Sequence, residues 1–300
     1  MSLLMSHVSR FSIAFPLPYG IFVNLFVFTP ALCEQEDFLF RVSKGNYMKI
    51  AISGKGGVGK TTLSAFLCKW FGDQGRTVLA IDADPATNLG TALAIPGAES
   101  LPPITEMKSL VAERTGTQPG SMGGYFKLNP KVDDLPDKIA ISDGNIRLMV
   151  MGGVQQGGTG CLCPENALLK SLVAHLMLGR GEVVVMDMAA GLEHLGRGTA
   201  QAVDRLIIVV EPGRRSIDVA QRIRTLAGDI GLKNLYFVGN KVRGSGDREF
   251  LQQALEGFQF IGFIPYDDKI IEADLKGEFA ADVSDQTRTA LEEIANTISP

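Results

Sequence analysis

The sequence predicts an α/β fold in which a mostly parallel, twisted sheet is covered by helices on both faces. From residue 48 onward, short apolar runs alternate with amphipathic stretches, as strands and crossover helices do in such folds. Several runs are apolar almost throughout, which indicates strands that are buried on both faces. With 300 residues and 45% hydrophobic content, the chain is long enough to bury a sizeable core.

Strands and helices are expected at regular intervals along this part of the chain. The strands are expected at 48–53, 77–82, 146–152, 183–188, 205–211, 235–242 and 260–265. The helices are expected at 60–74, 165–179, 216–230, 247–256 and 286–297. Residues 92–145 are richer in Pro and Gly, with one helix expected near 105–115. We interpret them as an insertion within a single domain that spans 48–300.

Residues 1–47 differ from the rest of the chain. Residues 11–33 carry no charged side chain, so a signal or membrane-anchor segment is one interpretation. However, Pro16, Pro18 and Pro30 interrupt any helix there, and a complete strand opens at residue 48. We therefore expect an N-terminal extension outside the fold.

Charge and cysteine content restrict the classes of partner. The formal net charge is −4 and the isoelectric point is about 5.5, so the chain has no general attraction for nucleic acid or anionic lipid. Four cysteines in a chain of this size argue against a disulfide scaffold and favour a reducing compartment. We expect a cytoplasmic protein without nucleic-acid or membrane partners.

The stretch "ISGKGGVGKTT" follows the first expected strand and precedes a helix. Gly54, Gly59, Lys60 and Thr61 satisfy the phosphate-loop pattern G-x-x-x-x-G-K-[ST], which predicts a P-loop NTPase. Backbone N–H groups of such a loop surround phosphate oxygens, Lys60 would neutralise the β and γ phosphates, and Thr61 would offer its hydroxyl to Mg²⁺. The expected ATP or ADP contacts in this loop are Gly54, Lys55, Gly56, Gly57, Val58, Gly59, Lys60, Thr61 and Thr62.

Lys55 is a second lysine, and it lies too early in the loop to share the role of Lys60. The string "GKGGVGKTT" resembles the deviant Walker A group of ATPases, which includes the nitrogenase iron protein and the septum-site and plasmid-partition ATPases. The resemblance implies that Lys55 reaches across a homodimer interface to the partner's nucleotide, much as an arginine finger does. The alternative is a surface lysine that only adds positive potential within its own subunit.

Carboxylates follow two other expected strands. Asp82 and Asp84 lie in "AIDADPATNLG", and Asp187 ends "VVVMD", an apolar strand that closes on a carboxylate as in Walker B. By resemblance, Asp84 belongs to switch I and orients or deprotonates the attacking water. Asp82 and Asp187 would each hold Mg²⁺ through a water molecule. The alternative for the first two is turn formation or helix capping.

Asn240 and Lys241 end the expected strand "FVGNKV". In the relatives this asparagine hydrogen-bonds the adenine edge, and an amide suits that role because it both donates and accepts. The pair lacks the following aspartate of a guanine-reading motif, so ATP is favoured over GTP. Residues 264–268, "IPYDD", are expected to help close the base pocket. His194, in a stretch that resembles switch II, is given no catalytic role.

Cys161 and Cys163 follow a glycine-rich loop and precede an expected helix. The positive end of a helix dipole favours the thiolate that metals require. Two thiolates are half of a tetrahedral sulphur site, so a dimer could supply four ligands for Ni²⁺ or Zn²⁺. The alternatives are two buried cysteines without metal or a strained C-x-C disulfide.

These cysteines narrow the resemblance to the CooC family, the accessory ATPases of carbon monoxide dehydrogenase maturation. The strings "SGKGGVGKTT", "DADP", "GCLCPENALL", "MDMAAGLEHLGRGT" and "VGNKV" occur in the expected order between residues 48 and 300. The resemblance implies an ATP hydrolase that handles nickel for the nickel carbon monoxide dehydrogenase, its client. Two alternatives stay open: an iron–sulphur scaffold or electron-transfer ATPase of the nitrogenase iron protein or Mrp type, and an ATP-dependent positioning module.

Overall fold

The computed structural model describes residues 48–118, 125–152, 163–179, 182–192, 195, 200 and 203–299, together with two short strands near the N-terminus. The chain divides into two compact units, Met1–Gly45 and Asn46–Pro300. In the first unit, β1 (Ile13–Pro16) pairs antiparallel with β2 (Phe22–Leu25). The rest of the extension expected at residues 1–47 lies outside the described residues, so its place outside the fold stays a prediction.

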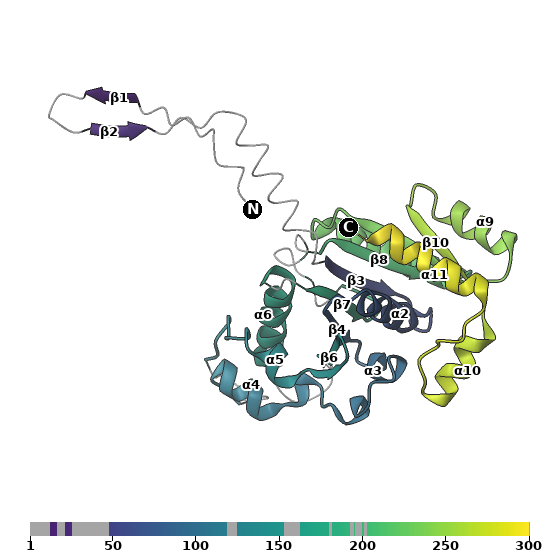
Figure 1. Ribbon diagram of the computed structural model, residues 1–300, viewed down its shortest axis with the longest axis horizontal. Coiled ribbons are helices and arrows are strands. Elements are labelled where there is room, and N and C mark those ends of the chain that lie inside the picture. Colours follow the sequence, from purple (N-terminus) through teal and green to yellow (C-terminus); the bar gives the residue numbers. More distant parts are fainter. Residues whose placement is uncertain are drawn as a thin grey trace, which may run out of the picture. The chain divides into compact units, whose positions relative to one another are not determined.

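The second unit is built on an eight-stranded sheet with the strand order β10-β9-β8-β3-β7-β4-β6-β5 (Figure 1). Its strands are β3 (Met48–Gly54), β4 (Val78–Ala83), β5 (Ile141–Asp143), β6 (Ile146–Val150), β7 (Val183–Met188), β8 (Arg205–Val210), β9 (Leu235–Val242) and β10 (Phe260–Pro265). Neighbouring strands are parallel except at the edge, where β5 runs antiparallel to β6. The predicted mostly parallel sheet is confirmed.

Helices pack on both faces of this sheet (Figure 1). The α-helices are α2 (Lys60–Asp73), α3 (Leu89–Ala92), α4 (Lys108–Thr115), α5 (Leu135–Ile139), α6 (Cys163–Gly179), α8 (Arg214–Asp229), α9 (Ser245–Ala254), α10 (Asp268–Lys276) and α11 (Asp285–Ile298). Two short 3-10 helices, η2 (Ala98–Ser100) and η3 (Ile104–Glu106), lie between α3 and α4. On one face α2, α3 and α11 cover the sheet, and on the other α4, α6, α8 and α9 do.

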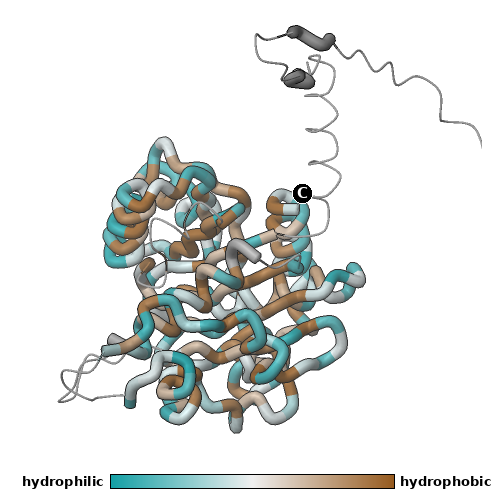
Figure 2. The backbone as a smooth tube through the Cα atoms, turned by 90° about the vertical axis from the view of Figure 1, so that its left-hand side faces the viewer, coloured by the Kyte–Doolittle hydropathy of each residue, from teal (hydrophilic) through white to brown (hydrophobic). Residues whose placement is uncertain are grey.

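The two faces bury two separate hydrophobic cores because side chains alternate along each strand. On β4, Leu79 and Ile81 enter the core beneath α6, whereas Val78 and Ala80 enter the core beneath α2. All four side chains are fully buried. Figure 2 shows the hydrophobic segments concentrated in the interior of this unit, with hydrophilic segments along its outer turns. The near-continuous apolar runs of the sequence therefore arise from burial on both faces.

Some elements differ from the sequence expectation. All seven expected strands form, but β5 was not expected, because a three-residue edge strand is too short to show a periodic pattern. Helix α10 was also missed. It is amphipathic, but it is short and none of its residues is fully buried, so it does not contribute to either core. Helix α6 begins at Cys163, two residues before the expected start at 165.

Candidate functional site

The glycine-rich loop joins β3 to α2 at the carboxyl end of the sheet. Gly54, which ends β3, has φ 152°, and a Cβ atom there would collide with the carbonyl oxygen of Val209 on the neighbouring strand β8. Gly59 caps α2 with φ 93°, and a Cβ atom there would collide with the side-chain amide of Asn240. These two glycines allow the backbone to turn tightly at the start of α2. The loop N–H groups therefore gather at a helix N-terminus, the arrangement that receives phosphate.

Lys60 is the first residue of α2, and its side chain lies across the loop. Only 5% of the residue is exposed. Its Nζ donates a hydrogen bond to the carbonyl oxygen of Lys55 at 3.5 Å, and lies 3.8 Å from Oδ2 of Asp84. The Asp84 carboxylate is fixed in turn, because its Oδ1 accepts a hydrogen bond from the N–H of Ala86 at 3.0 Å. The structure thus brings together a buried ammonium group and a carboxylate that the sequence placed on different elements.

Asp187, Asp82 and Thr61 form a second cluster beside the loop. Asp82 on β4 and Asp187 on β7 are directly paired in the strand register, and both are almost fully buried. The Thr61 hydroxyl donates to Oδ2 of Asp187 at 2.7 Å, whereas the buried Oδ1 has no hydrogen-bond partner among the described residues. Asp82 accepts hydrogen bonds from the N–H groups of Asp84 and Leu89 at 3.2 and 2.9 Å.

Burial changes the acidity of both carboxyl groups. It raises the pKa of Asp187 to about 7, and the hydroxyl of Thr61 and the charge of Asp82 modify that value in opposite directions. Burial likewise raises the pKa of Asp82 to about 6, against the effect of its backbone hydrogen bonds. Two buried carboxyl groups and a hydroxyl, with one carboxyl oxygen unpartnered, fit a hard divalent cation with oxygen ligands. Thr61, Asp187 and Asp82 are therefore suited to hold Mg²⁺.

Asn240 and Lys241 close the other side of the loop. The Asn240 amide donates to the carbonyl oxygen of Val58 at 2.7 Å and accepts from the backbone N–H of Lys241 at 2.8 Å. Lys241 has φ 56°, a left-handed conformation, and its Nζ donates to the carbonyl oxygen of Gly57 at 2.6 Å. Both residues thus support the loop from β9. The adenine contact of Asn240 stays a prediction.

A hollow next to Asn240 lies where β9 and β10 end. Val242, Arg243, Pro265 and Tyr266 are among its lining residues, and the guanidinium carbon of Arg243 lies 4.9 Å from the Tyr266 ring centre. Pro265 and Tyr266 belong to the "IPYDD" stretch that was expected to close a base pocket. The contact of these residues with a base stays a prediction.

Glu211 is a site residue that the sequence reasoning missed. It follows the last residue of β8, and its Oε1 lies 2.8 Å from Nζ of Lys55. Its Oε2 lies 3.5 Å from Nζ of Lys241. The available signal was its position directly after an apolar strand, the same signal that identified Asp187. Glu211 thus joins the two lysines on the outer side of the loop.

The structure describes little of the two cysteines that were predicted to bind metal. Cys161 and His194 lie outside the described residues, and so does the side chain of Cys163. Over the described ranges, no three His, Cys, Asp or Glu side chains form a cluster that could hold a metal ion by itself. Cys68 is buried within α2, and burial raises the pKa of its thiol.

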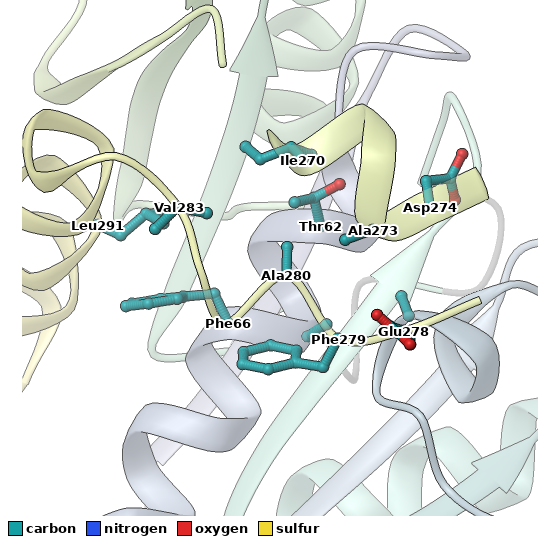
Figure 3. A pocket seen from close by; sticks show the side chains of 12 residues that line it. Thr62, Phe66, Ile270, Ala273, Asp274, Glu278, Phe279, Ala280, Val283 and Leu291 are labelled. Atoms are coloured by element: carbon teal, nitrogen blue, oxygen red, sulfur yellow. The ribbon is translucent and has the colours of Figure 1, made fainter. Parts of the chain in front are cut away.

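A separate, largely apolar pocket lies on the outer side of α2 (Figure 3). Thr62 and Phe66 of α2 line it together with Ile270 and Ala273 of α10. Two carboxylates, Asp274 and Glu278, belong to its lining. Carboxylates and an apolar wall do not suit a triphosphate, so the glycine-rich loop, and not this pocket, is the candidate nucleotide site.

Comparison with known proteins gives a consistent result. The model of a family described as the CobQ/CobB/MinD/ParA nucleotide binding domain matches residues 49–280. Carbon monoxide dehydrogenase accessory protein CooC of Rhodospirillum rubrum is 44% identical over 80% of this chain and 92% of its own length. An uncharacterized ATP-binding protein of Methanocaldococcus jannaschii is 45% identical over 77% of this chain and 90% of its own. The solved MinD cell division protein of Aquifex aeolicus superimposes with a TM-score of 0.59 at 20% identity, over 84% of this chain and 96% of that one.

Proposed function

Because this chain belongs to the CobQ/CobB/MinD/ParA family of P-loop ATPases, we propose that its ATPase cycle serves the maturation of nickel carbon monoxide dehydrogenase. The observation that carries the proposal is the 44% identity to the CooC accessory protein over 92% of that protein's length. The C-x-C pair, whose second cysteine is the first residue of α6, supports it, because soft thiolate ligands suit nickel and zinc. The resemblance to the CooC family that the sequence predicts is confirmed.

In the proposed reaction, the loop and its flanking side chains bind and orient ATP. Loop N–H groups and Lys60 hold the β and γ phosphates, and the unpartnered oxygen of Asp187 lies beside Thr61 to hold Mg²⁺ together with Asp82. When bound, Mg²⁺ neutralises charge that develops on the phosphate oxygens. Asp84, whose carboxylate lies 3.8 Å from the Lys60 ammonium group, would orient a water for in-line attack on the γ phosphate.

The proposal includes a homodimer. Lys55 would act on the nucleotide of the partner subunit, so that complete charge neutralisation requires two chains. Cys161 and Cys163 from each chain would form one shared thiolate site for nickel or zinc, which is cargo rather than a resident cofactor. Hydrolysis would release the contacts of Asp84 and the segment after Asp187, and so change metal affinity or docking to the dehydrogenase.

We place this activity in the cytoplasm, where thiols stay reduced. Along the described part of the chain, none of the helices is both long and apolar enough to span a bilayer.

The proposal is tested by metal analysis and mass measurement on the same samples. Purified protein is loaded with Ni²⁺ or Zn²⁺, with and without AMPPNP and Mg²⁺, and its bound metal and mass in solution are measured. We expect about one metal ion per two chains and a dimer with nucleotide. The Cys161→Ala/Cys163→Ala variant should lose the metal and keep ATP binding, whereas Cys33→Ala, the matched control, should keep both. Wild-type metal content in the double variant would contradict the ligand assignment.

A second measurement addresses the client. Nickel carbon monoxide dehydrogenase produced without this protein should gain activity when the protein, ATP and Ni²⁺ are added together. The Lys55→Ala variant should fail in this assay and also lose the nucleotide-dependent dimer. Equal activation by wild type and by Lys55→Ala would contradict the proposed role of the dimer.

A further inference from the structure

Lys55 does not point freely into solvent in the isolated subunit. Its ammonium group lies 2.8 Å from Oε1 of Glu211, and the two side chains are 33% and 23% exposed. The other carboxylate oxygen, Oε2, lies 3.5 Å from the ammonium group of Lys241. Glu211 is therefore a counter-ion that Lys55 and Lys241 share. A carboxylate and a phosphate both pair with an ammonium group, so Glu211 and a nucleotide phosphate are competing partners for Lys55.

The position of Glu211 is fixed by the backbone around it. Strand β8 is paired in parallel with β3, with Val209 opposite Gly54, so the residues that follow both strands lie side by side. The N–H of Glu211 donates to the hydroxyl of Ser216 at 3.0 Å, and Ser216 is buried in the first turn of α8. The carboxylate is thus held at a defined place by a strand end and a helix start. It can orient the long Lys55 side chain without rearrangement of the backbone.

Two lysines of the same loop are directed differently. Nζ of Lys60 lies over the loop, next to the carbonyl oxygen of Lys55, whereas Nζ of Lys55 lies at Glu211. An ion pair that is about one third exposed is weak, because solvent screens it. A triphosphate carries several charges and binds ammonium groups more strongly than one carboxylate does. The pair between Lys55 and Glu211 is therefore strong enough to hold a side chain and weak enough to be exchanged.

We propose that Glu211 is a positioning residue that holds Lys55 within its own subunit and releases it only when the nucleotide of a partner subunit competes for it. This inference rests on the proposed function, because it assumes that Lys55 acts across a dimer. Each subunit would exchange its own carboxylate for the partner's phosphates on dimerisation. Without ATP, Lys55 would lose its contact with Glu211 on dimerisation and gain no phosphate contact, so dimerisation would be less favourable.

The experiment measures the dimer dissociation constant by sedimentation, with AMPPNP and Mg²⁺, together with the ATPase rate as a function of protein concentration. Glu211→Gln keeps the shape of the side chain and removes its charge. We expect its dimer dissociation constant to fall about two- to fivefold, and its ATPase rate to saturate at a correspondingly lower protein concentration. Asp143→Asn is the matched control, because it removes another partly exposed ion pair, with Lys69 at 3.5 Å, on the edge strand β5. It should behave as wild type.

Coupling between the two residues separates positioning from a structural role. In the Lys55→Ala background, where the nucleotide-dependent dimer should be lost, Glu211→Gln should not restore it, because no lysine side chain is left to release. Glu211→Asp, which keeps the charge but shortens the reach, should give an intermediate constant and serves as the second variant. An unchanged or weaker Glu211→Gln dimer, or a dimer restored by Glu211→Gln in the Lys55→Ala background, would overturn the inference. A wild-type protein that stays monomeric with AMPPNP would instead contradict the proposed dimer, and the inference would fall with it.

Discussion

The buried side chain of Asp187 lowers the stability of the fold when it is ionised, so its replacement by asparagine should stabilise the fold. The side chain is fully buried, and burial raises its pKa from the ordinary 3.8 to about 7. At pH values between 3.8 and about 7, the folded chain binds more protons at this residue than the unfolded chain does. The contribution of Asp187 to stability is therefore largest at low pH and is lost as the pH rises through about 7. Asparagine carries no charge at either end of this range.

The size of the effect follows from the two pKa values. Above pH 7, the ionised carboxylate lowers the free energy of unfolding by about 4 kcal/mol relative to the fully protonated group. Between pH 5 and pH 8 the change is about 2–3 kcal/mol, since part of the cost is already present at pH 5. The amide oxygen of the substituted asparagine can still accept the hydrogen bond from Thr61, so the substitution does not leave that hydroxyl without a partner.

Urea unfolding at pH 5 and pH 8, in EDTA and without nucleotide, measures this effect. The difference in unfolding free energy between Asp187→Asn and wild type should be about 2–3 kcal/mol larger at pH 8 than at pH 5. The same variant should gain no stability from Mg²⁺ and ATP, whereas wild type should. Asp143→Asn, on an edge strand with its carboxylate partly exposed, serves as the control variant. A pH-independent difference for Asp187→Asn would refute the reasoning.

Three further substitutions test the loop and its surroundings. Lys60→Ala should raise the dissociation constant for ATP about 100-fold, because it removes a buried ammonium group from the phosphates, and titration calorimetry measures this; binding within about threefold of wild type would exclude the role. Asp84→Ala should lower kcat about 100-fold or more and change ATP binding little, which single-turnover kinetics can separate; equal losses of binding and turnover would contradict it. Gly59→Ala should lower the free energy of unfolding by about 1–3 kcal/mol, because φ is 93° and a Cβ atom there would collide with Asn240. Thermal unfolding without nucleotide measures this effect. An unchanged melting temperature would contradict the expected strain.

The sequence predicts the layers of this fold better than its edges. The strands β3, β4 and β7 are buried on both faces, so their apolar runs are long and uninterrupted. By contrast, β5 has only three residues, too few to show a periodic pattern, and α10 is a nine-residue helix none of whose residues is fully buried. Short elements at the edge of the fold, which bury little, therefore give weaker sequence signals than the buried strands do.

The same limit explains why the candidate site was only partly predicted. Gly54, Lys60 and Asp187 lie within local motifs, each of which follows or ends a strand, so their types and spacing were sufficient. Glu211 belongs to no motif. Its contact with Lys55 exists because β8 is the neighbour of β3 in the sheet, and strand order is a tertiary property that 156 residues of sequence separation do not record.

The charges around the loop indicate how nucleotide and cation binding are linked. Lys55 is paired with Glu211 at 2.8 Å, and Lys60 faces Asp84 at 3.8 Å. The carboxyl group of Asp187 has no equally close cation among the described residues, and its raised pKa records that cost. A triphosphate alone would bind the ammonium groups of Lys55 and Lys60. It would also add negative charge beside the Asp187 carboxylate and so make ionisation of that carboxyl group still less favourable. A triphosphate accompanied by a divalent cation binds the lysines and also offsets the negative charge of Asp187, which is a physical reason for the Mg²⁺ dependence of this site.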